Sequence, residues 1–348
     1  MTVLDVHPSG TRAPFAPRGD LGAAVLARLT GGADGAGLPD AALAALARTT
    51  DPSRDDDVQL ALFALYASAY GSIDAFDPDL EWDPELVRTR RILETAFEAA
   101  LREAVTVADV PPPSADAVAR RLFALTAADT GPSLSRHVAK RATPAQLREF
   151  LIQRSVYTLR EADPHSWAIP RLAGRPKAAL VEIQSDEYGG GRPDRVHAAL
   201  FARAMRGAGL DDSYGAYVDD VPAVTLASLN AMSMFGLNRR LVGAIVGHLA
   251  AFEMTSSIPN RFYAEGLRRA GYGPDVTEYF DEHVEADAVH EQIAGRDLAG
   301  ALAEDRPELV ADIVFGAAVC LEVDGRVGAH ILDAWADGRS SLRERTAA

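Results

Sequence analysis

Apolar positions along the 348-residue chain recur every three to four residues, and the sequence shows no alternating strand pattern. This spacing places apolar side chains on one face of an α-helix. The pattern predicts helices over residues 19–31, 41–49, 57–71, 84–105, 115–128, 144–162, 176–188, 193–208, 221–235, 239–256, 260–271, 274–294 and 306–337. The sequence therefore predicts an all-α fold.

Clusters of proline and glycine separate these helices. The segments PPPS, residues 111–114, and DTGPS, residues 129–133, break the helical pattern. The pair Thr143–Pro144 then predicts a helix start, with threonine as N-cap and proline at the first helical position. We accordingly place a domain boundary near residue 140. We expect a disordered leader over 1–18, a helical accessory region over 19–140 and a core domain over 141–340.

Charge and cysteine content narrow the function classes. The formal net charge of −15 disfavours nucleic-acid binding and anionic membranes, because phosphate groups repel an acidic surface. The single cysteine, Cys320, excludes an intramolecular disulfide framework, as is typical of a cytoplasmic protein. Residues 1–20 lack signal-peptide features, and the most apolar run, 241–252, is too short to cross a bilayer. We therefore expect a cytoplasmic protein without nucleic-acid or membrane contact.

The segment HVEADAVH, residues 283–290, carries two of the chain's eight histidines. Positions i, i+4 and i+7 of a helix lie at about 0°, 40° and −20° around its axis, so His283, Asp287 and His290 share one stripe. Chance matches to this spacing in such a composition number on the order of a few hundredths. The stripe favours a metal site, and a solvated acidic helix face is the alternative.

A glutamate and a glutamate–histidine pair upstream offer further donors. Glu253 stands in an otherwise apolar helix, where a carboxylate is seldom left unpaired. Glu187 and His197 flank the glycines 189–191, which allow a tight turn between two helices. We expect Pro193 to open the second of these helices, one turn before His197. Taken singly, each residue also fits an ordinary role on a helix surface or in the core.

Glu161 is a further candidate ligand, located at the end of the helix predicted over 144–162. Imidazoles and carboxylates without thiolates suit iron or manganese better than a structural zinc ion. With Glu161 included, four carboxylates would balance the charge of two ferrous ions, which makes a buried pair of ions electrostatically acceptable.

These residues resemble the haem-oxygenase-like dimetal oxidases, also called iron-containing redox enzymes. Members of that family carry a glutamate and a histidine on early core helices, a glutamate on a middle helix, and a late helix with His-x-x-x-Asp/Glu-x-x-His. The resemblance covers about residues 140–337. It assigns the metal ligands to Glu187, His197, Glu253, His283, Asp287 and His290.

The spacing is most similar to the family's N-oxygenase branch, which includes the core of the N-nitrosourea-forming enzyme. In that branch an additional upstream glutamate binds iron, and Glu161 stands where this ligand would be. Members also precede the core with a helical dimerisation segment, so the resemblance implies a homodimer formed through residues 20–135. We expect no counterpart of their cupin domain, and therefore no N-nitrosation.

The resemblance implies two iron ions per chain, O₂ as co-substrate, and oxygen transfer to a nitrogen of a small amine, guanidine or amino-heterocycle in biosynthesis. The sequence has no flavin or dinucleotide motif, so we expect electrons from an external donor such as a ferredoxin. Five side chains on or beside the ligand-bearing helices are candidate walls of the substrate pocket, or ordinary packing residues: Tyr157, Tyr188, Met232, Phe235 and Phe252.

Two other functions fit the same residues. The same ligands could support oxidative decarboxylation or C–C cleavage of an amino or fatty acid. A non-enzymatic iron-binding protein is a third reading, although ferritin-type sites use paired Glu-x-x-His motifs that this sequence lacks. Fold analogy alone does not separate these functions.

Overall fold

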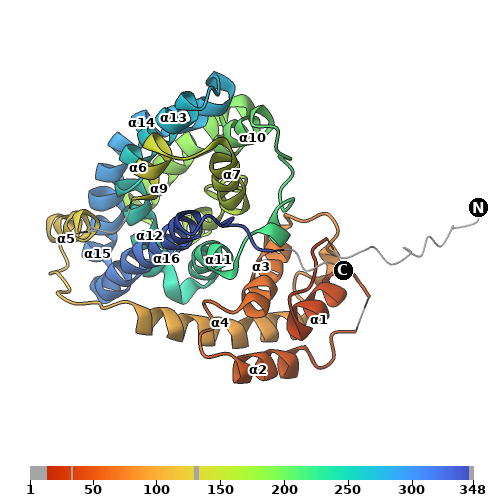
Figure 1. The fold of residues 1–348 in the computed structure, drawn as a ribbon. Coiled ribbons are helices and arrows are strands. Elements are labelled where there is room, and N and C mark those ends of the chain that lie inside the picture. Colours follow the sequence, from red (N-terminus) through yellow and green to blue (C-terminus); the bar gives the residue numbers. More distant parts are fainter. Residues whose placement is uncertain (1–13, 33, 129–132, 345–348) are drawn as a thin grey trace, which may run out of the picture. The chain divides into compact units, whose positions relative to one another are not determined.

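The computed structural model describes residues 14–32, 34–128 and 133–344, and the backbone alone at residues 285–288. The described residues form helices and turns without strands, so the predicted all-α fold is confirmed (Figure 1). The chain divides into two compact units, residues 1–100 and 101–348. This division falls earlier in the chain than the boundary that we place near residue 140.

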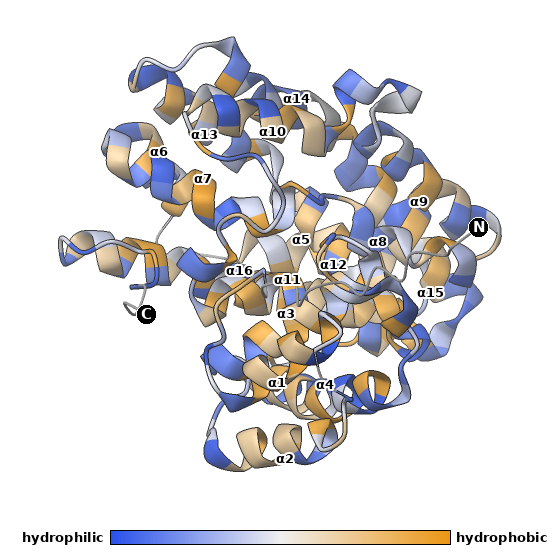
Figure 2. Cartoon of the chain, turned by 90° about the vertical axis from the view of Figure 1, so that its right-hand side faces the viewer, coloured by the Kyte–Doolittle hydropathy of each residue, from blue (hydrophilic) through white to orange (hydrophobic). Residues whose placement is uncertain are grey.

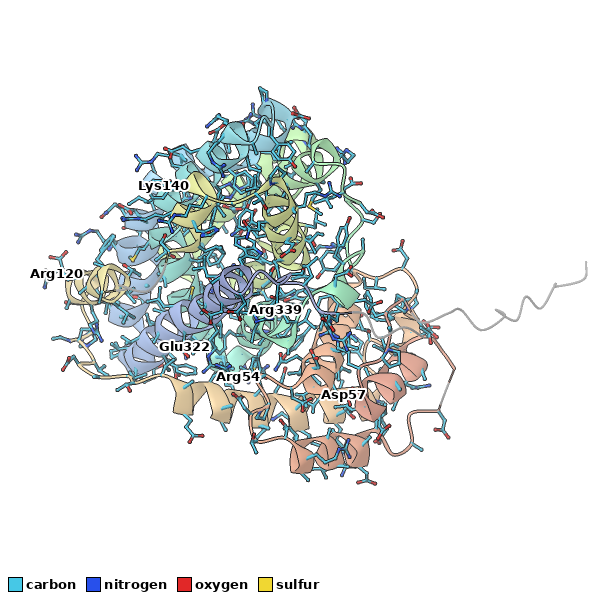
Figure 3. The ribbon with its side chains drawn as sticks, viewed as in Figure 1. Arg54, Asp57, Arg120, Lys140, Glu322 and Arg339 are labelled. Carbon is cyan, nitrogen blue, oxygen red and sulfur yellow. The ribbon has the colours of Figure 1, made fainter. Side chains whose placement is uncertain are left out.

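The described part of the first unit contains four α-helices and one 3₁₀ turn: α1 (Asp20–Leu29), α2 (Leu38–Arg48), α3 (Asp56–Tyr70), η1 (Pro78–Leu80) and α4 (Pro84–Ala104), which continues past the division. Asp57, labelled in Figure 3, fixes the start of α1, because its carboxylate accepts hydrogen bonds from the backbone N–H groups of Leu21 and Gly22 at 3.0 and 2.7 Å. Phe15 is buried against Phe63, so part of the expected leader is folded. Residues 1–13 lie outside the described residues.

The second unit holds the predicted core. Its α-helices are α5 (Ala115–Ala127), α6 (Leu134–Lys140), α7 (Pro144–Thr158), α8 (Asp163–Ser166), α9 (Gly174–Glu187), α10 (His197–Gly207), α11 (Ala223–Leu237), α12 (Val242–Met254), α13 (Ser257–Arg269), α14 (Pro274–Gln292), α15 (Ala301–Asp305) and α16 (Val310–Ala336). A π-helix, η7 (Ile293–Gly300), joins α14 to α15. The residues described in this unit also form the short 3₁₀ turns η2 (Ile169–Arg171), η3 (Gly189–Gly191), η4 (Pro193–Arg195), η5 (Val218–Asp220), η6 (Arg239–Leu241) and η8 (Pro307–Leu309).

Helix boundaries in this unit follow local chemistry. Thr143 caps α7 as predicted: its hydroxyl accepts from the Gln146 N–H at 3.3 Å, and the Gln146 side chain accepts from the Thr143 N–H at 3.0 Å. The prediction that Pro193 opens a helix is wrong, because Pro193 lies in η4 and α10 begins only at His197. Val196, with φ −56° and ψ 127°, interrupts the helical backbone between them. His197 therefore occupies the first turn of its helix.

Helices α12 and α16 pack with their backbones almost touching. A Cβ atom on Gly247 would lie 1.8 Å from the carbonyl oxygen of Ile313, and one on Gly316 would lie 1.9 Å from that of Ala244. Glycine alone permits this crossing. Figure 2 shows hydrophobic and hydrophilic positions interleaved along the helices, as expected for helices with one face in the core.

Membrane-spanning potential is low among the described helices taken one at a time. None of them has both the length and the apolarity needed to cross a bilayer. Only the segments Arg239–Met254 and Ser257–Arg269 taken together, with a bend of 49° between them, are long and apolar enough.

Candidate metal centre

Six of the seven predicted ligands come together in the interior of the second unit. They form two groups that share Glu187, and within each group the potential ligand atoms lie within 4.8 Å of one another. All six residues are buried. The first group contains Glu161, Glu187, His197 and His283, and the second contains Glu187, Glu253 and His290.

A glycine turn brings Glu187 and His197 together. Glu187 ends α9 and His197 begins α10, and Nδ1 of His197 lies 2.8 Å from Oε2 of Glu187. Gly189 has a φ of +71°, and a Cβ there would lie only 2.6 Å from the backbone nitrogen of Val196. The turn thus requires glycine for both its backbone angle and its space.

Glu161 lies three residues beyond the end of α7, so the predicted helix over 144–162 is too long at its end. The hydroxyl of Tyr279 contacts both carboxylate oxygens of Glu161 at 2.8 Å. The next residue, Ala162, has a φ of +75°, which is uncommon for a residue with a side chain. Its carbonyl accepts a hydrogen bond from the Gln184 side chain at 3.2 Å, which ties this turn to α9.

His283 is oriented by its own helix. Its Nδ1 lies 2.7 Å from the carbonyl oxygen of Tyr279, which can only accept, so Nδ1 carries the proton. The lone pair of the neutral ring is then on Nε2, which is buried without a hydrogen-bond partner among the described residues. Nε2 lies 3.7 Å from Oε2 of Glu161. A buried imidazole lone pair beside a carboxylate, with the other ring nitrogen bonded to a backbone carbonyl, suits metal binding.

The second group joins α12 to α14. Nδ1 of His290 lies 3.5 Å from Oε2 of Glu253, and its Nε2 lies 3.0 Å from Oδ2 of Asp186. When Nε2–H donates to Asp186, the Nδ1 lone pair faces Glu253 and Glu187. The π-helix begins three residues after His290, and such wide turns are frequent at functional sites.

Burial and neighbouring charges displace the protonation equilibria of these groups. Burial, followed by the charge of Glu187, raises the pKa of Glu161 to about 8. Burial opposes ionisation of Glu187, yet the adjacent His197 lowers the pKa of Glu187 to about 2. Burial lowers the pKa of His290, but Glu253 outweighs it and brings the pKa to about 9. The side chains thus compensate one another's charge by sharing protons.

The donor set fits iron. The three histidines and three glutamates supply nitrogen and oxygen donors only, and the single cysteine, Cys320, is buried in α16. Hard and intermediate donors of this kind favour iron or manganese over sulfur-held ions. His283 and His290, seven residues apart on α14, fall into different groups. The side chain of Asp287 lies outside the described residues.

Two of the five predicted pocket residues stand beside the ligands. Tyr157 and Phe252 line a small cavity together with Glu161, Glu187 and Glu253. The volume in which the centre of a water molecule can lie is about 10 Å³. Their rings meet edge to face, with centroids 5.3 Å apart.

The other three predicted pocket residues do not line this small cavity. Met232 lines a larger cavity described below. The structure does not bring Tyr188 or Phe235 to either cavity, because the Tyr188 hydroxyl hydrogen-bonds Asp163 at 2.9 Å and Phe235 packs against Phe315.

Sequence reasoning missed several residues that support the ligands. Tyr279 precedes His283 by one helical turn, and Asp186 adjoins Glu187, so helical spacing around the ligands could have found both. A buried histidine pair had no such signal: Nε2 of His165 lies 3.2 Å from Nδ1 of His248, and His165 lines the small cavity. Burial lowers the pKa of His165 to about 4, so this residue is neutral at pH 7.

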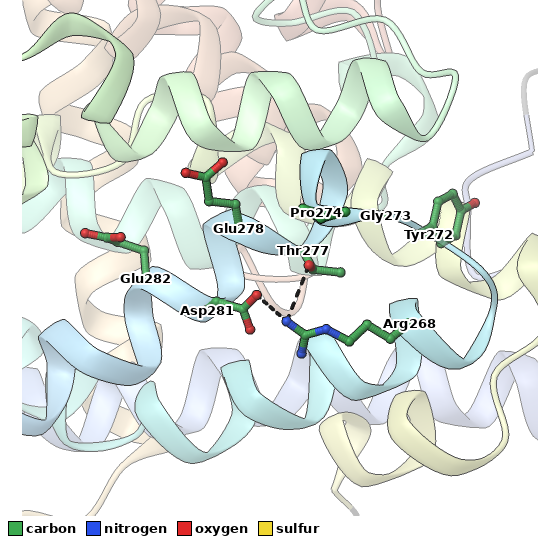
Figure 4. A pocket seen from close by; sticks show the side chains of 8 residues that line it. All are labelled: Arg268, Tyr272, Gly273, Pro274, Thr277, Glu278, Asp281 and Glu282. Atoms are coloured by element: carbon green, nitrogen blue, oxygen red, sulfur yellow. Dashed lines mark hydrogen bonds and ion pairs between the residues drawn. The ribbon is translucent and has the colours of Figure 1, made fainter.

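The outer face of α14 is occupied by ion pairs. A surface hollow of about 440 Å³ lies there. Figure 4 shows that Arg268 reaches Asp281 and Thr277 in this hollow. Glu278 in the same hollow pairs with Arg195 and Arg203. These charged side chains pair with one another. The ion pairs hold α14 against its neighbours, so that Tyr279 and His283 point inward.

Comparison with known proteins agrees with this donor set. A profile of the family described as iron-containing redox enzymes matches residues 148–325, slightly more than half of the chain. The chain belongs to the iron-containing redox enzyme family. The chain is therefore an oxidoreductase. The match confirms the family that the order and spacing of Glu187, His197, Glu253 and the late histidines predict.

A solved structure supports the fold. A CADD-like protein of unknown function from Nostoc punctiforme PCC 73102 superposes with a TM-score of 0.50 at 18% identity, covering 63% of this chain and 97% of that chain. This similarity concerns the fold alone, and the family match over residues 148–325 confirms the predicted haem-oxygenase-like core. No sequence among curated proteins matches the chain.

Proposed function

We propose that this protein is a non-haem diiron N-oxygenase that uses O₂ to oxidise a nitrogen of a small amine, guanidine or amino-heterocycle. The observation that carries the proposal is the position of Glu187, which belongs to both ligand groups. A carboxylate shared between two groups can bridge two metal ions. Bound iron would supply electron transfer to and from oxygen.

The chain's own residues prepare the site. Glu161 and His283 would complete the ligands of one ion with His197, while Glu253 and His290 would complete those of the other. Tyr279 and Asp186 orient Glu161 and His290 through hydrogen bonds.

The surroundings of the ligands restrict what reaches them. The small cavity beside them leaves little room for water, and the aromatic rings of Tyr157 and Phe252 stand at its wall. Reactive species formed there would be shielded from solvent.

The position of Glu161 supports nitrogen as the oxidised atom. This additional carboxylate lies in the first ligand group, where the resemblance to the N-oxygenase branch expects one. A substrate nitrogen with a free electron pair can accept an oxygen atom without prior hydrogen abstraction.

The first test counts metal ions. Anaerobic titration with Fe(II) should give two ions per chain, and His283→Ala and His290→Ala should each lower the number towards one. His330→Ala is the matched control, because His330 hydrogen-bonds the Ser341 carbonyl at 2.9 Å and belongs to neither group. A wild-type protein that binds no iron would sink the proposal.

The second test identifies the reaction. Loaded protein is mixed with O₂, an external reductant and candidate amines, guanidines or amino-heterocycles, and products are analysed by mass spectrometry with ¹⁸O₂. Label attached to nitrogen supports the proposal. Release of CO₂ from amino or fatty acids without label on nitrogen would instead select the oxidative decarboxylase.

A further inference from the structure

A buried tyrosine connects the ligand Glu161 to a cation. The hydroxyl of Tyr279 contacts both carboxylate oxygens of Glu161 at 2.8 Å, and the Tyr279 side chain also hydrogen-bonds Arg154 of α7. Arg154 belongs to neither ligand group. It therefore stands behind the ligands, separated from Glu161 by one phenol.

Aromatic rings hold the guanidinium group in place. Its Cζ lies 5.7 Å from the ring centroid of Tyr263 and 5.9 Å from that of Phe150. The ring of Phe280 packs against both Tyr263 and Tyr279, with centroids 6.0 and 5.0 Å apart. Cation–π contacts fix a guanidinium without occupying its N–H donors. Those donors remain available to Tyr279.

The same neighbours stabilise the positive charge of Arg154. Burial lowers the pKa of Arg154, but Tyr279, Tyr263 and Glu161 outweigh this effect and leave the pKa raised. Arg154 also lines, together with Met232, the larger cavity of about 930 Å³. A charge removed from water requires such partners. The carboxylate among these stabilising groups is the ligand Glu161.

Donor chemistry sets the direction of the two hydrogen bonds. A guanidinium group can only donate, so the Tyr279 oxygen accepts from Arg154. The single hydroxyl hydrogen of Tyr279 then points to Glu161. The carbonyl oxygen of Tyr279 lies 2.7 Å from Nδ1 of His283, so the same residue also orients a second ligand.

We propose that Arg154 is a positioning residue of the metal centre, which orients Glu161 through the hydroxyl of Tyr279. Hydrogen bonds to a ligand fix the direction of its lone pairs, and their loss weakens metal binding. Arg154 would thus control the iron affinity of the first ligand group without touching an ion. This inference rests on the metal centre of the proposed function, but not on the identity of the substrate.

Anaerobic Fe(II) titration of the full-length protein tests the role. Arg154→Met removes the charge and the donors, and should weaken iron binding at the first group by about 10-fold, the lower end of the effect of an orienting residue. Arg154→Lys keeps a charged donor and should recover most of the affinity. Arg148→Met is the matched control on the same helix, because Arg148 donates to the carbonyl groups of Ala208 and Gly209 instead.

A double-mutant cycle with Tyr279→Phe separates positioning from packing. A packing defect or a charge effect through space would weaken binding equally with and without the hydroxyl, whereas an effect through the hydroxyl is lost with it. We expect Arg154→Met to change the affinity of Tyr279→Phe protein by less than about 2-fold. Equal losses in both backgrounds would overturn the proposal, and so would a loss in Arg154→Lys as large as in Arg154→Met.

If Arg154→Met does not fold, iron-free protein decides. NMR of protein with ¹⁵N-labelled arginine should show a guanidinium signal that is absent in Arg154→Lys and that shifts in Tyr279→Phe. A signal unchanged by Tyr279→Phe would overturn the proposal. Wild-type protein that binds no iron would overturn the proposed function and this inference together, whereas normal iron binding with equal losses in the cycle would overturn this inference alone.

Discussion

The hydroxyl of Tyr279 contacts both carboxylate oxygens of Glu161 at 2.8 Å, although the two residues are 118 positions apart. Tyr279 lies on α14, one turn before His283, and its carbonyl oxygen accepts the Nδ1 proton of that histidine. One residue therefore positions two members of the first ligand group, from its side chain and from its backbone. Hydrogen bonds of this kind fix the direction in which a ligand presents its lone pair.

Replacement of the tyrosine hydroxyl should weaken iron binding. We expect Tyr279→Phe to lower the affinity of the first group for Fe(II) by about 10- to 100-fold, as for other residues that orient ligands. Anaerobic titration measures this affinity, and circular dichroism should show unchanged helicity. Tyr263→Phe removes a hydroxyl from another buried tyrosine, whose ring packs on Phe150, and should leave the affinity unchanged. Equal affinities in the two variants would show that Tyr279 does not position Glu161.

The glycine turn between Glu187 and His197 offers a matched pair of substitutions. Gly190 has a φ of +58° with open space around it, so Gly190→Ala should cost about 1–2 kcal/mol of folding free energy from the backbone angle alone. Gly189→Ala adds a clash with the backbone of residues 195–196 and should cost more. It should also separate Glu187 from His197 and weaken iron binding. Urea unfolding and iron titration measure both effects, and equal costs would contradict this account.

Iron binding should release protons. At pH 7 the iron-free protein holds a proton on Glu161, whose pKa is raised to about 8, and on His290, whose pKa is raised to about 9. Metal ligands must be deprotonated, so affinity should rise from pH 7 to about pH 9 and level off above it.

Calorimetry in buffers of different ionisation enthalpy counts the protons released. Glu161→Gln should release about one proton fewer than the wild-type protein, because the amide carries no ionisable proton. Release that is independent of this substitution would mean that Glu161 is not a ligand.

The crossing of α12 and α16 should tolerate no side chain at its centre. A Cβ on Gly247 would lie 1.8 Å from the Ile313 carbonyl oxygen, so Gly247→Ala must displace the helices and should cost at least about 1–3 kcal/mol. Gly325→Ala on α16 meets no atom within 4 Å and should instead stabilise the helix by about 0.5–1 kcal/mol. Denaturant midpoints compare the two. A neutral Gly247→Ala would refute the close crossing.

Features governed by neighbours in sequence could be predicted. Thr143 and Pro144 fixed the start of α7, because the side chain and backbone that form the cap lie within one turn. The stripe of His283 and His290 follows from helical periodicity. The run of glycines at 189–191 adopts positive φ throughout, as a tight turn between two ligands requires.

Features that depend on the packing of distant segments could not be predicted from the sequence. The start of α10 depends on Val196, whose extended backbone has no distinct sequence signal. Glu161 lies beyond the end of α7, although the apolar pattern predicts a helix as far as residue 162. The contact of Tyr279 with Glu161 and of Asp186 with His290 joins residues more than a hundred positions apart, which no local pattern encodes.

The sequence by itself determined the helical fold and the family, because helical periodicity and the spacing of histidines along one helix are local properties. Tertiary structure alone decided that Glu187 belongs to both ligand groups, and that Tyr279 connects Arg154 to Glu161. The physical reason is that burial and charge pairing arise only when distant helices pack, and these interactions set which groups remain available for a metal ion or a substrate.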